Sequence, residues 1–137
     1  MVTGAFLALA ACGSSSAPSP ISFPQAPFQT LQSKDGVYTV DVYSSPAQPP
    51  IRAVCAFKYD VRFSDGGAPA PNLDVTVVPW MPAMNHGVSI APTTKALSTP
   101  GSYEIDDVYL GMAGEYELES SIAGTVPDSV APTFSVN

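Results

Sequence analysis

Side chains with soft donor atoms gather in one short segment of this sequence. Residues 77–89, VVPWMPAMNHGVS, contain Met81, Met84 and His86, and His86 is the single histidine of the 137-residue chain. Met112 is the one further internal methionine. Thioether sulfur is a neutral ligand that favours Cu(I), and imidazole also binds copper. Zinc prefers thiolates, several histidines or carboxylates, and calcium prefers oxygen ligands, so these residue types favour copper.

The same residues also have an interpretation without a metal. Methionine fills irregular gaps in hydrophobic cores and adapts to binding surfaces, and a lone histidine is commonly a surface or hydrogen-bonded residue. Trp80, directly before Met81, could draw the segment onto a core. A metal-free tip that contacts another protein is therefore the alternative to a copper site.

Alternation of apolar and polar residues predicts strands on both sides of this segment. In residues 52–63 the apolar side chains fall on one parity, and the other parity carries Lys58, Asp60 and Arg62. This is the pattern of a strand with one buried face. Similar patterns predict strands at 37–43, 72–78, 102–110, 115–122 and 133–136, with a short strand near 88–97. Within 102–110 the alternation slips by one at Asp106 and Asp107, which predicts a β-bulge.

Composition supports an all-β domain. The chain has 15 prolines and 10 glycines, which weaken helix interiors, and turn residues separate the predicted strands. We therefore expect one immunoglobulin-like β-sandwich of about six to seven strands over residues 35–137. The net charge of −7 argues against a nucleic-acid partner.

The order of the predicted strands places the donor residues at one end of the sandwich. Turns between successive antiparallel strands alternate between the two ends. The loop 80–87 and the turn 111–114 are separated by one turn, near 98–101, so they belong to the same end. Met112 is then expected beside Met81, Met84 and His86.

Catalytic motifs are missing from the sequence, and we expect no enzyme. A Ser-His-Asp arrangement would have to use His86, and no Gly-x-Ser-x-Gly elbow or phosphate-binding glycine loop occurs. Cys55 falls on the apolar parity of its strand, where a thiol is usually inert packing.

The N-terminus predicts export and lipid attachment. Leu9-Ala10-Ala11-Cys12 follows a short apolar run and resembles the bacterial lipobox, although no Lys or Arg precedes the run. Residues 1–11 are then a signal peptide, Cys12 is the lipidated residue, and the Pro/Ser-rich remainder of 12–34 is a tether. A Cys12–Cys55 disulfide is the competing interpretation.

A family resemblance adds to this interpretation. PWMPAMNHG followed by GSYEIDDVYLGMAGEYELESSI, within residues 73–122, resembles the YtkA-like domain, which is related to FixH-type accessory proteins. The resemblance implies an exported, often membrane-tethered β-sandwich with a role in copper handling or oxidase assembly. It also implies Met81, Met84, His86 and Met112 as candidate ligands. The ligand types, although not their spacing, are similar to those of PCuAC-type periplasmic copper chaperones.

These observations together predict a lipid-anchored protein on the periplasmic side of the bacterial cell envelope that binds Cu(I). A chaperone or a storage module would suit such a site, with an envelope or membrane protein, such as an oxidase assembly partner, as its partner. The alternative is a metal-free adhesion or assembly module that uses its Trp- and Met-rich tip.

Overall fold

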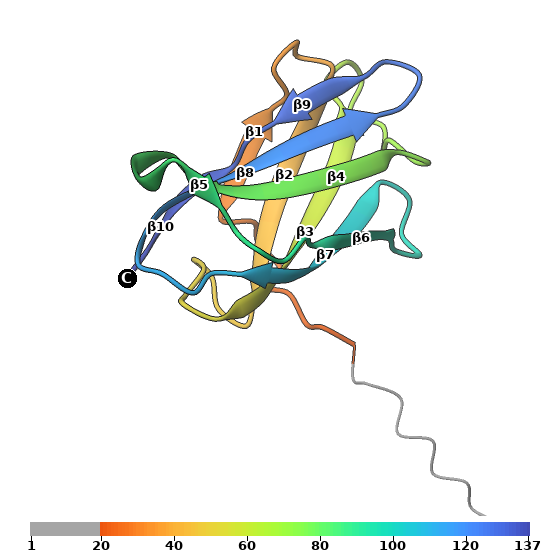
Figure 1. The fold of residues 1–137 in the computed structure, drawn as a ribbon. Helices are drawn as coiled ribbons and strands as arrows, with labels where there is room; N and C mark the ends of the chain where they lie inside the picture. The colour runs from red at the N-terminus through yellow and green to blue at the C-terminus, as the bar shows by residue number, and fades with distance from the viewer. Residues whose placement is uncertain (1–19) are drawn as a thin grey trace, which may run out of the picture.

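The structure is a computed structural model that describes residues 20–137 (Figure 1). The predicted signal peptide, the lipidation site Cys12 and residues 13–19 of the tether lie outside the described residues, and their roles stay predictions. Within residues 20–137, no helix has the length and apolar character needed to cross a membrane.

The described chain folds as a β-sandwich of two antiparallel sheets, which confirms the predicted fold class. The first sheet has the order β1-β2-β3-β7-β6, formed by β1 (Gln29–Gln32), β2 (Tyr38–Ser45), β3 (Val54–Phe63), β7 (Ser102–Tyr109) and β6 (Thr93–Ala96). The second has the order β10-β8-β4-β5, formed by β10 (Thr133–Val136), β8 (Gly114–Ala123), β4 (Asp74–Met81) and β5 (His86–Gly87). A further short strand, β9 (Asp128–Val130), pairs with β8. Short strands such as β1, β5 and β9 explain why ten strands are found where six to seven were expected.

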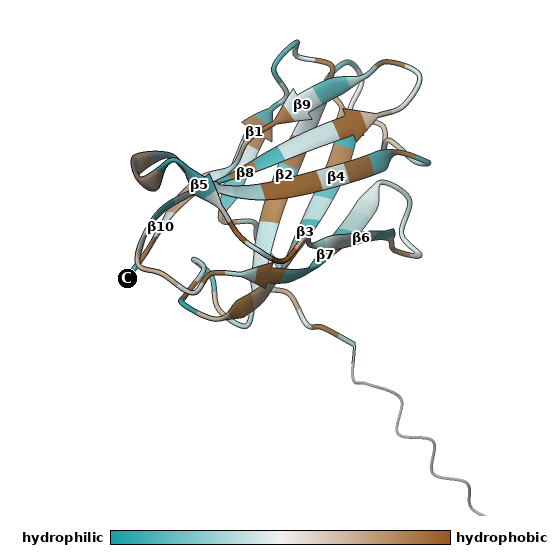
Figure 2. Cartoon of the chain, viewed as in Figure 1, coloured by the Kyte–Doolittle hydropathy of each residue, from teal (hydrophilic) through white to brown (hydrophobic). Residues whose placement is uncertain are grey.

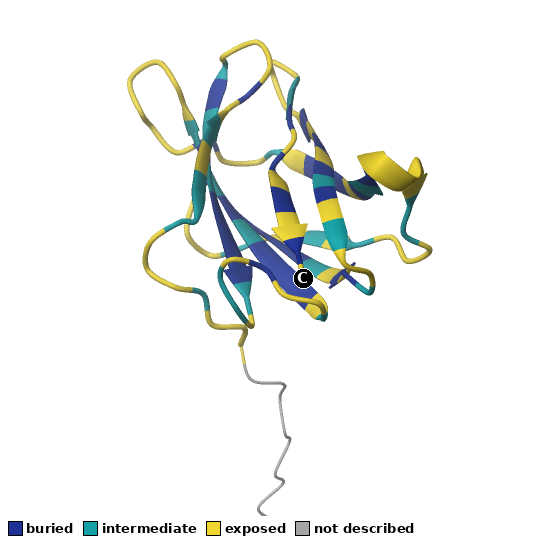
Figure 3. Cartoon of the chain, turned by 90° about the vertical axis from the view of Figure 1, so that its left-hand side faces the viewer, coloured by how far each residue is buried: buried dark blue, intermediate teal, exposed yellow. Residues whose placement is uncertain are grey.

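Inward-facing residues of the long strands fill the space between the sheets. On β3 the predicted parity is observed, because Cys55, Phe57, Tyr59 and Val61 are at most 2% exposed. Hydrophobic segments recur along β2 and β4 in Figure 2, and Figure 3 shows that the buried residues lie in the strands while the loops are mostly exposed. Phe134 of β10 packs between Phe57 and Tyr116, with ring centroids 5.5 and 6.0 Å away, and so joins the two sheets.

The predicted bulge in β7 is present. Cys55 pairs with Val108 and Phe57 pairs with Ile105, so one residue of β3 lies opposite Asp106 and Asp107. Asp107 has a φ angle of 62°, in the left-handed region. Beyond the bulge, Val108 is fully buried and the parity of the strand has changed, as the sequence pattern indicated.

The sandwich begins inside the segment that was assigned to the tether. β1 pairs with β2 from Gln29↔Val42 to Gln32↔Thr39, and Phe28 packs against the core. The four residues of β1, QTLQ, contain one apolar side chain and are only partly buried, so alternation could not reveal this strand.

Asp128 of β9 ties the C-terminal part of the chain to the turn between β1 and β2. Its carboxylate accepts hydrogen bonds from the Ser33 hydroxyl at 2.5 Å and from the backbone N–H groups of Asp35 and Val37 at 3.0 and 3.3 Å. Its own strand adds the Ser129 N–H at 2.8 Å. Burial alone would raise the pKa of this carboxyl, but the hydrogen bonds lower it below 3.8.

Candidate metal centre

The hairpin between β4 and β5 brings His86 next to Met81. β4 continues through Pro79 to Met81, three residues beyond the predicted end, and β5 pairs back with Trp80↔Gly87 and Met81↔His86. Directly opposed residues of antiparallel strands project to the same face, with Cβ atoms about 4.5–5.5 Å apart. The register of this hairpin therefore places an imidazole beside a thioether.

A second turn brings Met112 to the same place. Tyr116 of β8 is 1% exposed, and its hydroxyl donates to the Met112 carbonyl at 3.0 Å and accepts from the Met112 N–H at 3.2 Å. These two bonds fix the backbone that carries Met112 against the start of β8.

The hairpin and the turn border a cavity of about 230 Å³ that is open to solvent. Its lining comprises Met81, His86, Gly87, Val88, Ser89, Tyr109, Gly111, Met112 and Tyr116. Met81 is 2% exposed, while Met112 is 45% exposed and His86 is also exposed. One donor side chain is thus buried in the core and two are accessible from solvent.

Met84 is the candidate ligand that the cavity does not include. It lies on the 3₁₀ turn η1 (Pro82–Met84), which packs against β8, and its side chain is 45% exposed. Asn85 closes this turn with a φ angle of 51° and donates its backbone N–H to the Pro82 carbonyl. The structure thus brings together three of the four sequence candidates and leaves Met84 outside the group.

The hydrogen bond of His86 leaves one ring nitrogen available for a ligand. Nδ1 lies 2.9 Å from the Gly87 carbonyl oxygen, which can only accept, so Nδ1 carries the proton. In the neutral ring with this bond, Nε2 has the lone pair. A metal-binding histidine commonly donates its second ring N–H to a carbonyl in this way, because the bond orients the ring.

Gly114 allows Met81 to occupy its position. A Cβ atom at Gly114 would lie 3.0 Å from the Met81 methyl carbon, and Gly114 has a φ angle of 142°. A residue with a side chain would be strained there and would press on Met81, so glycine suits this first position of β8.

The donor atoms around the cavity fit a soft, singly charged metal ion. Two thioethers and one neutral imidazole suit Cu(I), and no carboxylate lines the cavity. No group of three or more His, Cys, Asp or Glu side chains in the part of the chain that the structure describes is placed to hold a metal ion. Cys55 lies elsewhere, 2% exposed, and burial raises the pKa of its thiol.

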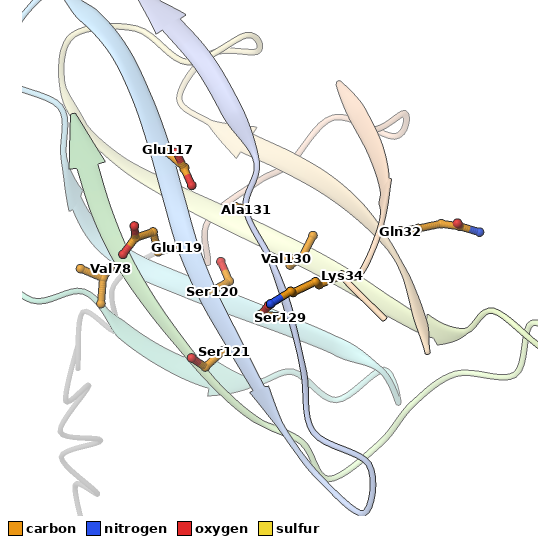
Figure 4. Close-up of a pocket in the computed structure, with 10 residues that line it drawn as sticks. All are labelled: Gln32, Lys34, Val78, Glu117, Glu119, Ser120, Ser121, Ser129, Val130 and Ala131. Carbon is orange, nitrogen blue, oxygen red and sulfur yellow. The ribbon is translucent and has the colours of Figure 1, made fainter. Parts of the chain in front are cut away.

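A larger hollow, of about 480 Å³, lies on the outer side of the second sheet (Figure 4). Residues of β8 and β9 line most of it, together with Gln32, Lys34, Val78 and Ala131. It includes Glu117 and Glu119 but none of the sulfur or imidazole donors. Size alone therefore does not select the site, and the chemistry of the lining favours the smaller cavity.

Sequence reasoning did not identify Tyr109 and Tyr116 as cavity residues. Tyr116 falls on the inward parity of β8, which predicts a core side chain but not its bond to the Met112 backbone. Tyr109 falls on the outward parity of β7, so alternation alone would place it in solvent. The sequence Tyr109-Leu110-Gly111, with an aromatic residue two positions before a glycine, is the feature that could have indicated the role of Tyr109 in the cavity.

Comparison with known proteins agrees with this architecture. No curated protein matches the sequence. A copper-bound variant of FetP from a uropathogenic strain of Escherichia coli has the same fold, with a TM-score of 0.54 and 10% sequence identity over 78% of this chain and 93% of FetP. FetP from the same strain, isolated after expression in the periplasm, gives a TM-score of 0.55 and 11% identity over 83% and 95%. At this identity the likeness concerns the fold alone.

The family follows from the sequence. Residues 32–121, more than half of the chain, match the YtkA-like family, and they include β2 to β7, both turns of the cavity and most of β8. The chain belongs to the YtkA-like family.

Proposed function

We propose that this protein binds Cu(I) in the cavity between the β4–β5 hairpin and the turn before β8. The observation that carries the proposal is the convergence of Met81, His86 and Met112 on one cavity. Met81 and His86 are fixed by strand register, and Met112 is fixed by the hydroxyl of Tyr116. The fold thus holds the backbone of all three donor residues beside the cavity, which supports the proposal.

The exposure of the donors favours a chaperone or a storage module over a permanent structural site. Met81 anchors the inner end of the cavity, while His86 and Met112 lie at its mouth, where an incoming ligand can compete for the metal. All three donors are neutral, so the bound ion would leave no uncompensated anion behind when it is transferred. Copper bound to FetP, which shares this fold, adds support.

Lipid attachment and location complete the proposal. The lipobox-like sequence before Cys12 would anchor the chain to a membrane on the periplasmic side of the bacterial envelope, and the Pro/Ser-rich residues after it would hold the sandwich away from the surface. An envelope or membrane protein, such as an oxidase assembly partner, would then receive or supply the copper.

A competition titration of Cu(I) against a chromogenic chelator tests the site. The protein carries Cys12→Ser, so that it stays free of lipid, and is compared with Met112→Leu and His86→Ala in the same background. Loss of a direct ligand is expected to weaken Cu(I) binding at least about tenfold, since even residues that only orient ligands change metal affinity about 10- to 100-fold. Unchanged affinity in both variants would rule out the site.

Met84→Leu is the matched control for Met112→Leu. Both methionines are 45% exposed, and both substitutions replace a thioether by an aliphatic side chain, but only Met112 lines the cavity. We expect Met84→Leu to keep the affinity of the parent protein. An equal loss would show that Met84 is a ligand, as the family resemblance implies, and that η1 moves toward the cavity when copper binds.

A metal-free assembly module is the second candidate. Met84, Tyr109 and Met112 are each 45% exposed, and such apolar, adaptable side chains suit a protein contact. If the titration detects no Cu(I) binding, a cross-linking experiment from an exposed position on η1 would test this alternative. Partner capture that Met84→Ala and Met112→Ala abolish, in the absence of copper, would support it.

A further inference from the structure

Tyr109 lies on the outward face of β7, as strand alternation predicts, but its ring also reaches the cavity. Its neighbours Val108 and Leu110 are fully buried in the core, so the Tyr109 side chain leaves the strand on the opposite face. The ring nevertheless lines the copper cavity, because it folds back over Gly111.

Gly111 makes room for that ring. A Cβ atom at Gly111 would lie 2.5 Å from Cζ of Tyr109 and 2.6 Å from both Cε1 and the hydroxyl oxygen. All three atoms belong to the far end of the tyrosine side chain. The absence of a side chain at Gly111 is therefore what lets the Tyr109 ring lie across the turn.

The turn beneath the ring is held at three points. The Leu110 N–H donates to the Ala53 carbonyl at 2.9 Å, and the Arg52 guanidinium donates to the Gly111 carbonyl at 3.1 Å. Tyr116 holds Met112 as described above. Tyr109 itself is 45% exposed, and no hydrogen bond joins its hydroxyl to another residue within 20–137. Hydrogen bonds hold the backbone of this turn, and rotation of the Tyr109 ring would break none of them.

We propose that Tyr109 is the residue that controls access to the cavity, and that Gly111 leaves the space that its ring occupies. In the position observed, the ring walls the cavity beside Met112 and restricts the approach of small solutes to the buried thioether of Met81. Rotation about the Tyr109 side-chain bonds opens the cavity without movement of the sandwich. The part of this role that concerns copper rests on the proposed function, but the restriction of access to Met81 does not.

Oxidation of the apo-protein by hydrogen peroxide measures this access without a metal. Peroxide transfers one oxygen atom to a thioether, which becomes a sulfoxide, and the remaining atoms leave as water. Peptide mass spectrometry gives the rate at Met81 relative to that at Met84, which is exposed, lies outside the cavity and serves as the internal reference.

Three variants of the full chain decide the outcome. Tyr109→Ala removes the ring, and Gly111→Ala displaces it while leaving the fold intact, because the clash involves only the end of a flexible side chain. Both are expected to raise the Met81-to-Met84 ratio on the order of fivefold, since the reaction follows the population of the open cavity. Tyr109→Phe keeps the ring and should match the parent. An unchanged ratio in Tyr109→Ala and Gly111→Ala would overturn the proposal.

The rate of Cu(I) transfer to an excess of chelator gives the second measurement. Tyr109→Ala and Gly111→Ala are expected to release copper on the order of fivefold faster than the parent and Tyr109→Phe. If the parent binds no Cu(I) while the oxidation ratio still rises, the copper function fails and the access role stands. If copper binds but neither the oxidation ratio nor the transfer rate changes in Tyr109→Ala and Gly111→Ala, the access role fails and the copper function stands.

Discussion

Substitution of Met81 separates a metal ligand from a core side chain, because Met81 has the burial expected of both. At 2% exposure it belongs to the hydrophobic core, and it also lines the cavity. Met81→Leu conserves volume and is expected to cost less than about 1.5 kcal/mol of unfolding free energy. Met81→Ala leaves a void and is expected to cost about 2–5 kcal/mol.

These free energies translate into thermal midpoints. For a domain of this size, 1 kcal/mol corresponds to a change in Tm of about 4 °C, so Met81→Ala should melt roughly 8–20 °C lower and Met81→Leu less than about 6 °C lower. Circular dichroism melts of the apo-proteins measure both values. A ligand role predicts that Met81→Leu, in spite of its stability, loses at least about tenfold in Cu(I) affinity, equivalent to about 1.4 kcal/mol.

Val77→Ala provides the control for stability. Val77 lies on the same inward face of β4, is 4% exposed and does not line the cavity. The variant should melt at a lower temperature and keep its Cu(I) affinity. If Met81→Leu also keeps the affinity of the parent, Met81 is a core residue and no more, and our reasoning about the inner end of the cavity is refuted.

Two further predictions concern Asp128 and Cys55. Asp128→Asn should lower the unfolding free energy by about 1–3 kcal/mol at neutral pH, because the amide cannot accept from all the donors around Ser33 and Val37. The folded-state pKa of Asp128 is depressed, so its contribution is complete above the unfolded-state value of 3.8 and is lost as the pH falls below it. Denaturant titrations at several pH values should therefore show a smaller acid-induced loss in the variant, and equal pH dependence would contradict this role. Cys55, buried and with a raised thiol pKa, should react slowly with an aromatic disulfide reagent in the native Cys12→Ser protein and completely after unfolding. Fast labelling of the native protein would contradict its burial.

The long strands were predictable because their sequences record which face is buried. The alternation in β3 and β4 identified the inward residues, and the slip at Asp106 and Asp107 identified the bulge. β1 was not predictable, since QTLQ lacks alternation and owes its strand to pairing with β2. A strand that forms mainly by pairing with its neighbour shows little alternation or β-propensity in its own sequence.

The candidate site was predictable in part. The alternation of turns between the two ends of the sandwich placed Met112 with the hairpin residues, and the cavity has this arrangement. The register of the β4–β5 hairpin could not be read from the sequence, and that register buries Met81 opposite His86 and leaves Met84 on the exposed turn. The involvement of Tyr109 depends on a close approach to Gly111, a three-dimensional contact that the sequence does not specify.

The bulge in β7 accommodates one extra residue, so that apolar residues on both sides of it face the core. Tyr103 and Ile105 face the core before the bulge, and Val108 and Leu110 face it afterwards. Deletion of one residue at Asp106 or Asp107 would therefore remove the bulge, leave Val108 and Leu110 facing the core and leave Tyr109 on the outward face. Relatives that lack the extra residue should have a regular β7 with the same residues facing inward, on an otherwise unchanged sandwich.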